Sequence, residues 1–262
     1  MARSLWAFAI AGIASLYPQG SPCLAEEAGQ AAPRFETYMG ADYGGRSASI
    51  SSRLIWSAFG PVTEPGFRLK LDGLSNVFGD TNAGVFSSGF LAADIKAMGD
   101  VMAGYQMNRG PYWIKFYAGA AYQSQARIVW EAGQAVTQQN WGGAAAIEAF
   151  WRNGRIWAAT NVSWLQMDNN ASIYSRLAYD ILRGGPAGLN LSIGAEAAAA
   201  TNNANVFKEG ARLDLYNDYV RAGALINLRY GAHDFSLSGG LSETGGEGMR
   251  RPFISLSYGK KF

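Results

Sequence analysis

The chain has little cysteine, histidine or charge. Its 262 residues include one Cys, Cys23, and one His, His233, and only 16% of them are charged. With so few nitrogen and sulfur ligands, we expect no transition-metal cluster and no cofactor. One cysteine cannot build a disulfide framework within the chain. The formal net charge of +2 is too small to indicate a nucleic-acid partner.

The chain also lacks an apolar run long enough for a membrane-spanning helix, which needs about 20 residues. The uncharged run at 5–17 is shorter and is broken at Pro18, and small residues at 23–25 offer a cleavage point. This layout is typical of a secretory signal peptide, and an N-terminal membrane anchor is the alternative. We therefore expect a signal peptide at 1–25, a short extension at 26–33 and one domain at 34–262.

What the chain does have is apolar content dispersed at period two. Hydrophobic residues make up 48% of the sequence, and the stretch Tyr112–Gln123 shows the pattern well. Residues Tyr112, Ile114, Phe116, Ala118, Ala120 and Tyr122 share one face. At about 3.3 Å per residue and a tilt near 40°, this stretch rises roughly 25 Å, the height of the apolar band of an outer-membrane barrel. Strands of soluble sandwiches are usually only about 5–6 residues long.

The same pattern recurs along the chain between turn signals such as 152–154, 183–186 and 231–234. We expect twelve strands, near 34–43, 46–58, 66–74, 92–106, 111–125, 142–151, 155–165, 172–182, 187–198, 217–230, 234–242 and 252–262. Long outer connections are expected at 75–90, 126–140, 199–212 and 243–250, whereas the link at 45–47 is an exceptionally short one. The fold class is thus all-β, a transmembrane antiparallel up-and-down β-barrel of about 12 strands. Ten or 14 strands are the variants, because 208–216 could add or displace one, and a soluble β-sandwich is the alternative fold.

The last strand indicates where such a barrel belongs. Ile254, Leu256, Tyr258 and Phe262 share one face, as expected of a strand that closes a barrel by pairing with the first. The strand resembles the signal that bacterial outer-membrane assembly machinery recognises, with Tyr258 and Phe262 as its main residues and Lys260 as a departure from the usual apolar residue. We expect export to the outer membrane of a Gram-negative bacterium, with membrane lipid and the assembly machinery as partners.

Charged residues on the opposite faces of the strands are candidates for the lumen. Pairing of acids with bases would satisfy these groups in a narrow interior, whereas two carboxylates about 5–9 Å apart could instead hydrolyse a glycosidic bond. The candidates are Arg68, Lys70, Asp72, Asp94, Lys96, Asp100, Lys115, Glu148, Arg176, Asp180, Glu196, Arg221 and Arg229. We favour structural pairing and name no catalytic residue.

A barrel enzyme that modifies lipids or glycans is the less favoured alternative. Such an enzyme would need a histidine beside a nucleophile, and His233 lies in an expected hairpin turn with no neighbouring H-x-S arrangement. The chain also has no G-x-S-x-G motif.

Tryptophans have two possible roles, because indole rings stack on sugars and also form interfacial girdles. Trp56 and Trp164 have girdle positions, whereas Trp113 and Trp157 share faces with polar residues and are expected to point inward. Trp130 and Trp141 flank the expected outer connection, so they are glycan-contact candidates, with the girdle as the alternative role.

Five stretches of the sequence resemble the BcsS family of cellulose-biosynthesis proteins. They are GADYGG at 40–45, GFRLKLDG at 66–73, AGYQ at 103–106, WIKFYAGAAYQ at 113–123 and IEAFW at 147–151. The resemblance implies an outer-membrane accessory role in making, exporting or anchoring cellulose, with cellulose and components of the cellulose synthase complex as partners. It supplies no catalytic residues. A generic small channel or an adhesion-type barrel is the alternative function.

Overall fold

The computed structural model describes residues 33–44, 47–79, 92–129, 134–168, 170–185, 188–201, 203–208, 211–216, 219–244 and 250–262. The expected signal peptide at 1–25 lies outside these residues, as does nearly all of the extension at 26–33. The described part of the chain contains no helix long and apolar enough to span a membrane.

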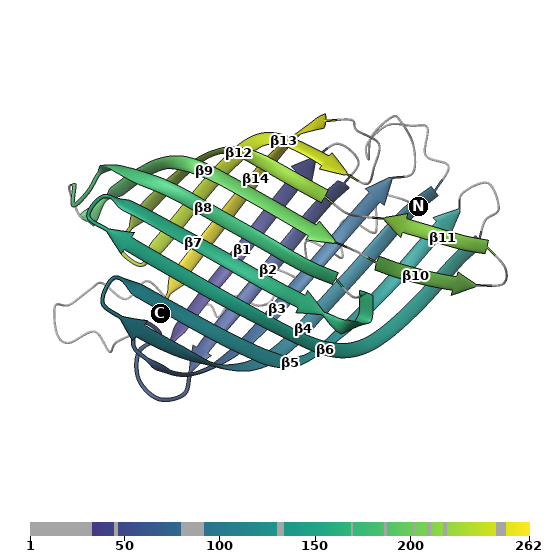
Figure 1. Cartoon of the computed structure of the whole chain (residues 1–262), viewed down its shortest axis with the longest axis horizontal. Coiled ribbons are helices and arrows are strands. Elements are labelled where there is room, and N and C mark those ends of the chain that lie inside the picture. The colour runs from purple at the N-terminus through teal and green to yellow at the C-terminus, as the bar shows by residue number, and fades with distance from the viewer. Residues whose placement is uncertain are drawn as a thin grey trace, which may run out of the picture. The chain divides into compact units, whose positions relative to one another are not determined.

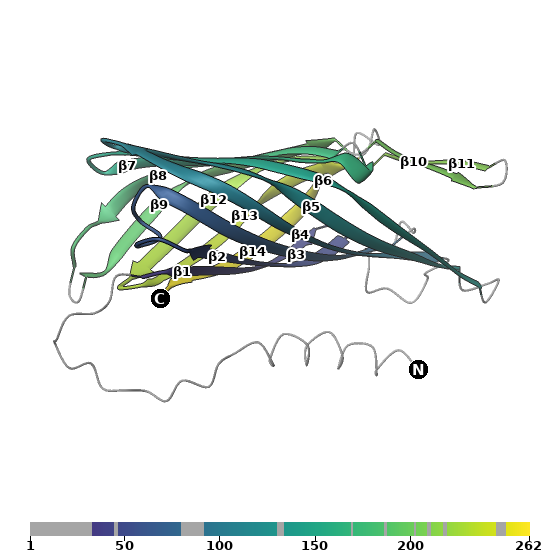
Figure 2. The ribbon, with the colours of Figure 1, turned by 90° about the horizontal axis from the view of Figure 1, so that it is seen from below.

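Twelve antiparallel strands form one closed barrel (Figures 1 and 2). Around the wall they follow the order β1-β14-β13-β12-β9-β8-β7-β6-β5-β4-β3-β2, in which neighbours in the chain are mostly neighbours in the sheet. Their bounds are β1 Phe35–Gly44, β2 Ser47–Ser57, β3 Gly66–Gly79, β4 Ala92–Arg109, β5 Tyr112–Val129, β6 Gln134–Asn153, β7 Ile156–Leu165, β8 Asn170–Leu182, β9 Asn190–Thr201, β12 Tyr219–Tyr230, β13 His233–Thr244 and β14 Arg250–Lys261. The prediction of an antiparallel barrel of about 12 strands is confirmed.

The connection between β9 and β12 contains two more strands. β10 (Asn203–Lys208) and β11 (Ala211–Tyr216) pair with each other as a separate two-stranded sheet. The expected long connection at 199–212 is therefore present, but much of it is paired as a hairpin. The same hairpin explains why the expected strand count could vary by two. It adds two strands to the chain but none to the barrel wall.

The sequence also underestimates the length of β4, β5 and β6, which have 18, 18 and 20 residues. The expected connection at 126–140 is wrong, because β5 runs to Val129 and pairs with β6 from Gln134 onward. Likewise β3 continues to Gly79, into the expected connection at 75–90. Polar residues lie on both faces of these segments, so alternation does not identify them as strands although the backbone pairing continues.

Short turns connect the strands at the end of the barrel where β1 begins and β14 ends. The turns between β4 and β5, β6 and β7, and β12 and β13 contain Gly110, Gly154 and Gly231, whose φ angles are 58°, 58° and 55°. Residues with a Cβ rarely adopt this left-handed conformation, so glycine is required to reverse the chain within two residues. At the opposite end β1 and β2 pair as far as Gly44 and Ser47, so that connection is as short as expected.

Pairing of the last strand with the first closes the barrel. Tyr258 lies opposite Met39 in an antiparallel register that runs from Glu36 to Gly44 on β1. The backbone N–H groups of Phe35 and Phe262 each donate to the other residue's carbonyl oxygen, at 3.1 and 2.8 Å. Closure therefore leaves neither of these strands with an unpaired edge.

Apolar side chains cover the outside of the wall and are exposed. Val220 on β12 is 63% exposed, whereas its inward-facing neighbours on the same strand, Leu225 and Asn227, are only 1% and 2% exposed. Other strands show the same alternation, with exposed Leu71, Val101, Phe116, Ile147, Leu177, Ile193, Leu237 and Leu256. A water-soluble protein does not expose an apolar belt of this extent. The outer face is therefore the lipid-facing surface of a membrane-spanning barrel.

Part of the interior is filled by apolar side chains and close backbone contacts. Met102, Tyr117 and Ala144, from β4, β5 and β6, belong to one buried cluster. Gly104 lies beneath the Tyr117 ring, and a Cβ there would come within 2.4 Å of the ring's Cδ1. Only glycine permits this approach, which lets the ring occupy the lumen. Side chains therefore fill part of the interior, as in other small barrels.

Candidate functional site: the barrel lumen

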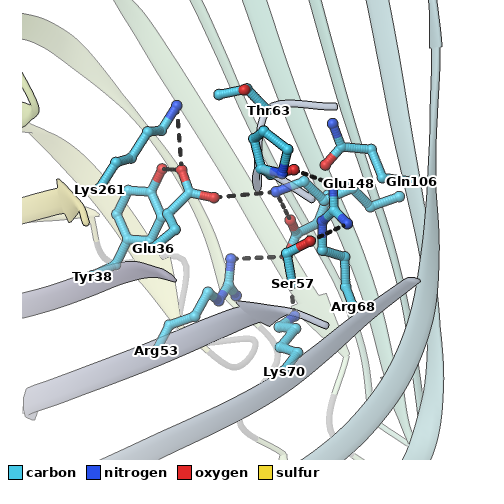
Figure 3. Close-up of polar contacts among 12 residues, drawn as sticks. Glu36, Tyr38, Arg53, Ser57, Thr63, Arg68, Lys70, Gln106, Glu148 and Lys261 are labelled. Atoms are coloured by element: carbon cyan, nitrogen blue, oxygen red, sulfur yellow. Dashed lines mark hydrogen bonds and ion pairs between the residues drawn. The ribbon is translucent and has the colours of Figure 1, made fainter. Parts of the chain in front are cut away.

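Buried charged side chains from several strands converge on Glu148 of β6, which is 6% exposed. Arg53 of β2 and Lys70 of β3 approach its Oε1 at 3.0 and 3.1 Å, and Lys115 of β5 lies 3.8 Å from its Oε2 (Figure 3). Arg53 also forms a bidentate pair with Asp72, with N–O distances of 2.8 and 3.1 Å. One carboxylate thus contacts cations from three other strands.

A second carboxylate extends this cluster across the lumen. Glu36 of β1 accepts a hydrogen bond from Lys115 Nζ at 3.3 Å, although three strands separate β1 from β5 around the wall. The Tyr38 hydroxyl donates a hydrogen bond to Glu36 Oε1 at an oxygen–oxygen distance of 2.7 Å, and Lys261 Nζ lies 3.6 Å from the same oxygen. The Glu36–Lys115 pair therefore spans the interior, and we refer to Glu36, Arg53, Lys70, Asp72, Lys115 and Glu148 together as the lumen network.

The connection between β2 and β3, residues 58–65, folds against the same end of the lumen. Arg68 is 2% exposed, and its guanidinium donates to Ser57 Oγ at 2.9 Å, to the carbonyl oxygen of Pro61 at 3.2 Å and to that of Glu64. Asn108 of β4 donates to the Thr63 carbonyl oxygen at 2.8 Å. These bonds hold the connection against β2, β3 and β4 at the barrel end at which β1 begins.

Another charged cluster is centred on Glu196 of β9. Its Oε2 accepts a hydrogen bond from the Tyr174 hydroxyl, with the two oxygens 2.7 Å apart. The carboxylate also lies 3.6 Å from a guanidinium nitrogen of Arg176 and 3.4 Å from one of Arg221. Arg221 of β12 also pairs with Asp42 of β1 at 2.9 Å, past the two strands β13 and β14 that lie between them. This cluster too connects strands that are not neighbours in the wall.

Asp180 and Arg229 lie near the barrel end where the short turns are. Asp180 is 1% exposed, pairs with Arg152 and accepts the Ser192 hydroxyl proton at 2.7 Å. Arg229 pairs with Asp234 at 2.9 Å and lies over the ring of Trp157, 5.0 Å from its centroid. All these contacts are made on the inner face of the wall.

The remaining lumen candidates are less connected. Lys96 is buried on β4, and Asp100 on the same strand lies opposite Asp72 in the register of β3 and β4. The side chain of Asp94 lies outside the described residues. The sequence reasoning missed Glu36, Asp42, Arg53, Arg152 and Asp234 as partners. Glu36, Asp42 and Arg53 occupy inward-facing alternate positions of the strands expected at 34–43 and 46–58, so alternation along those strands is the signal that identifies them.

The tryptophans separate into inner and outer positions. Trp157 is 2% exposed, and its Nε1 donates to Ser192 Oγ at 3.2 Å; Trp113 stacks on Phe150 below the Lys115 ammonium. Trp56 and Trp164 are exposed on the outer wall.

The two glycan-contact candidates do not flank a long loop. Trp130 lies outside the described residues. Trp141 is a strand residue of β6, is 75% exposed and packs against Tyr122 with ring centroids 4.7 Å apart. Both rings share the outer face with Ile147 and Phe116, so Trp141 has the position of a girdle residue.

Among the described residues, the histidine and several acidic residues make structural contacts. His233 is the first residue of β13, and its Nδ1 is 2.7 Å from the Tyr258 hydroxyl on the outer face. Within the described ranges, no three His, Cys, Asp or Glu residues are placed to hold a metal ion. Glu36, Glu148, Asp180 and Glu196 are ion-paired, whereas Asp100 Oδ1 is buried with no hydrogen-bond partner among the described residues.

No protein-family model matches the chain, and no curated protein matches it. Among solved structures, it is similar to the β domain of the Bordetella autotransporter BrkA, with 15% identity, 88% of this chain and 100% of that chain covered and a TM-score of 0.47. The KdgM porin has 8% identity, coverage of 87% and 99% and a TM-score of 0.47. The translocator domain of NalP from Neisseria meningitidis has 10% identity, 90% of each chain covered and a TM-score of 0.48. These sequence identities and TM-scores are too low to assign a function to the chain.

Proposed function

We propose that this chain is an outer-membrane barrel that serves cellulose biosynthesis, export or anchoring as a non-catalytic accessory, with a lumen closed to solutes. The observation that carries the closed lumen is the Glu36–Lys115 pair across the interior, together with the connection at 58–65 held by Arg68. Open aqueous channels are typical of barrels with about 16–18 strands, more than the twelve of this wall.

The link with cellulose rests on the resemblance of the five sequence stretches to the BcsS family. The absence of catalysis is supported by the ion pairing of the buried acids, since Glu148 and Glu196 each face two or more cations. Both carboxylates are thereby engaged in structural ion pairs.

Conductance tests the closed lumen. Refolded wild-type protein in planar bilayers is expected to give no steady ohmic current. Arg68→Ala is expected to give channel openings, because it removes the donors that hold Pro61 and Glu64. Glu64→Ala, which removes an exposed side chain from the same connection, is the matched control and should stay closed.

A steady wild-type current would contradict the closed lumen and would support the alternative of a small channel. Openings in the Glu64→Ala control equal to those of Arg68→Ala would show that the connection alone, and not its anchoring by Arg68, closes the lumen.

Cellulose output tests the accessory role. Deleting the gene in its own bacterium is expected to lower cellulose at the cell surface, and wild-type protein should restore it. His233→Ala should restore it equally well, because the ring contacts Tyr258 on the outer wall. Unchanged output after deletion would contradict the role, and failure of His233→Ala to restore output would revive the barrel-enzyme alternative.

A further inference from the structure

The wall of the barrel is uneven at the end opposite that at which β1 begins and β14 ends. β6 pairs with β7 only from Ala144 onward, so residues 134–143 of β6 continue beyond the end of β7. Over the same height β5 still pairs with β6 up to Val129 and Gln134. β5 and β6 therefore continue past the end of β7 (Figure 2), whereas β4 stays paired with β3 up to Ala93 and Gly79.

The inner face of this raised wall carries amide side chains. One cross-strand row joins Asn76, Lys96, Gln125 and Gln138, from β3, β4, β5 and β6 in turn. The next row, on the side of the barrel end at which β1 begins, joins Leu74, Met98, Gln123 and Asn140. Both rows have the inward parity of Lys70 and Glu148. We call Asn76, Gln125, Gln138 and Asn140, with Leu74 and Met98, the amide wall.

The amide wall differs in charge from the lumen below it. Lys96 is its one charged neighbour in these two rows and is 7% exposed, whereas the next row down contains Asp72 and Asp100. A surface of this kind does not attract an ionic ligand strongly, because it has little charge to offer. An amide both donates and accepts hydrogen bonds, which is also the capacity of a sugar hydroxyl.

The polar groups of the amide wall are available. Gln138 is exposed, and Gln125 and Asn140 are half-buried. In the described part of the chain none of these three side chains makes a hydrogen bond, and Asn76 Oδ1 is buried with no partner. The three accessible amides are thus the groups that a ligand reaches. Leu74 and Met98 add apolar surface, which suits the C–H faces of a sugar ring.

We propose that the amide wall is a binding site for a neutral polysaccharide at the outer mouth of the barrel. The choice of a β-glucan as the ligand rests on the proposed function, whereas the preference for an uncharged glycan follows from the residues alone. Hydrogen bonds from the three amides hold successive hydroxyls, and Leu74 and Met98 contact the ring. Because the lumen network closes the barrel below, the glycan is held at the mouth and does not pass through.

Calorimetric titration of the refolded full chain with cellohexaose tests this proposal. Wild-type protein is expected to bind, and the triple variant Gln125→Ala/Gln138→Ala/Asn140→Ala to bind at least about tenfold more weakly, because three hydrogen-bonding groups are lost. The matched control is Ser124→Ala/Thr137→Ala/Gln139→Ala, which changes the opposite face of the same two strands. A heat-modifiable band in gels verifies that both variants fold, and the control should bind as wild type does.

Three results would overturn the proposal: no binding of cellohexaose to wild-type protein, equal affinity of the triple variant, or an equal loss in the outer-face control. A hexagalacturonate that bound as tightly as cellohexaose would overturn the preference for a neutral ligand. These outcomes are separate from the proposed function, which fails on unchanged cellulose output after gene deletion.

Discussion

Replacing Glu148 with Ala is expected to lower the free energy of unfolding by about 3–5 kcal/mol, the usual cost of removing one partner of a buried ion pair. The substitution leaves Arg53, Lys70 and Lys115 without the carboxylate that they share, and Lys70 and Lys115 are 1% and 4% exposed. Urea titration of the refolded protein, followed by the heat-modifiable gel shift, measures the change.

Glu64→Ala is the control, because it removes the same charge from an exposed position in the connection at 58–65. We expect its free energy of unfolding to stay within about 0.5 kcal/mol of the wild type. If Glu148→Ala were as stable as this control, the lumen network would contribute little to the closed barrel, and the proposed obstruction of the lumen would lose its physical basis.

Replacing Leu256 with Pro is expected to prevent closure of the barrel. Leu256 lies in the middle of β14, opposite Ala41 of β1 on one side and Leu237 of β13 on the other. Proline has no N–H to donate to the ladder, and an unsatisfied backbone group in lipid costs several kcal/mol. Folded protein in the outer membrane should therefore fall at least about tenfold, as measured by the unboiled gel band.

Leu256→Ala separates the backbone effect from the loss of the side chain. It removes a lipid-facing side chain that is 57% exposed but keeps the N–H, so we expect near wild-type amounts of folded protein. A folded band for Leu256→Pro as strong as that for Leu256→Ala would contradict the argument that β14 closes the barrel through its backbone.

Closure and obstruction together bear on what the barrel does. The wall alone would enclose a narrow interior, and inside it Glu36–Lys115 at 3.3 Å and Arg221–Asp42 at 2.9 Å join strands that are not neighbours in the wall. Buried ion pairs are costly to desolvate, and they do not by themselves indicate high stability. This arrangement is the basis of the closed lumen proposed above.

The wall of the barrel followed closely from the sequence. Period-two alternation is a local property, because successive Cβ atoms point to opposite faces of any strand. The stretch from Tyr112 to Tyr122 therefore indicated which side chains face lipid before any partner strand was known. The assignment failed at 126–140, where Gln, Ser and Thr lie on both faces and alternation gives no signal. Pairing with the neighbouring strand, which is not local, keeps that segment extended.

The sequence by itself determined that this chain alternates into a barrel with an apolar outside and a charged inside. Only the tertiary structure decided which charges meet. Glu36 and Lys115 are 79 residues apart in the chain, and Asp42 and Arg221 are 179 apart. Their contact depends on the registers of all the strands between them and on the closure of β14 on β1. Parity places a side chain inside, but the partner that it meets there is set by the geometry of the whole wall.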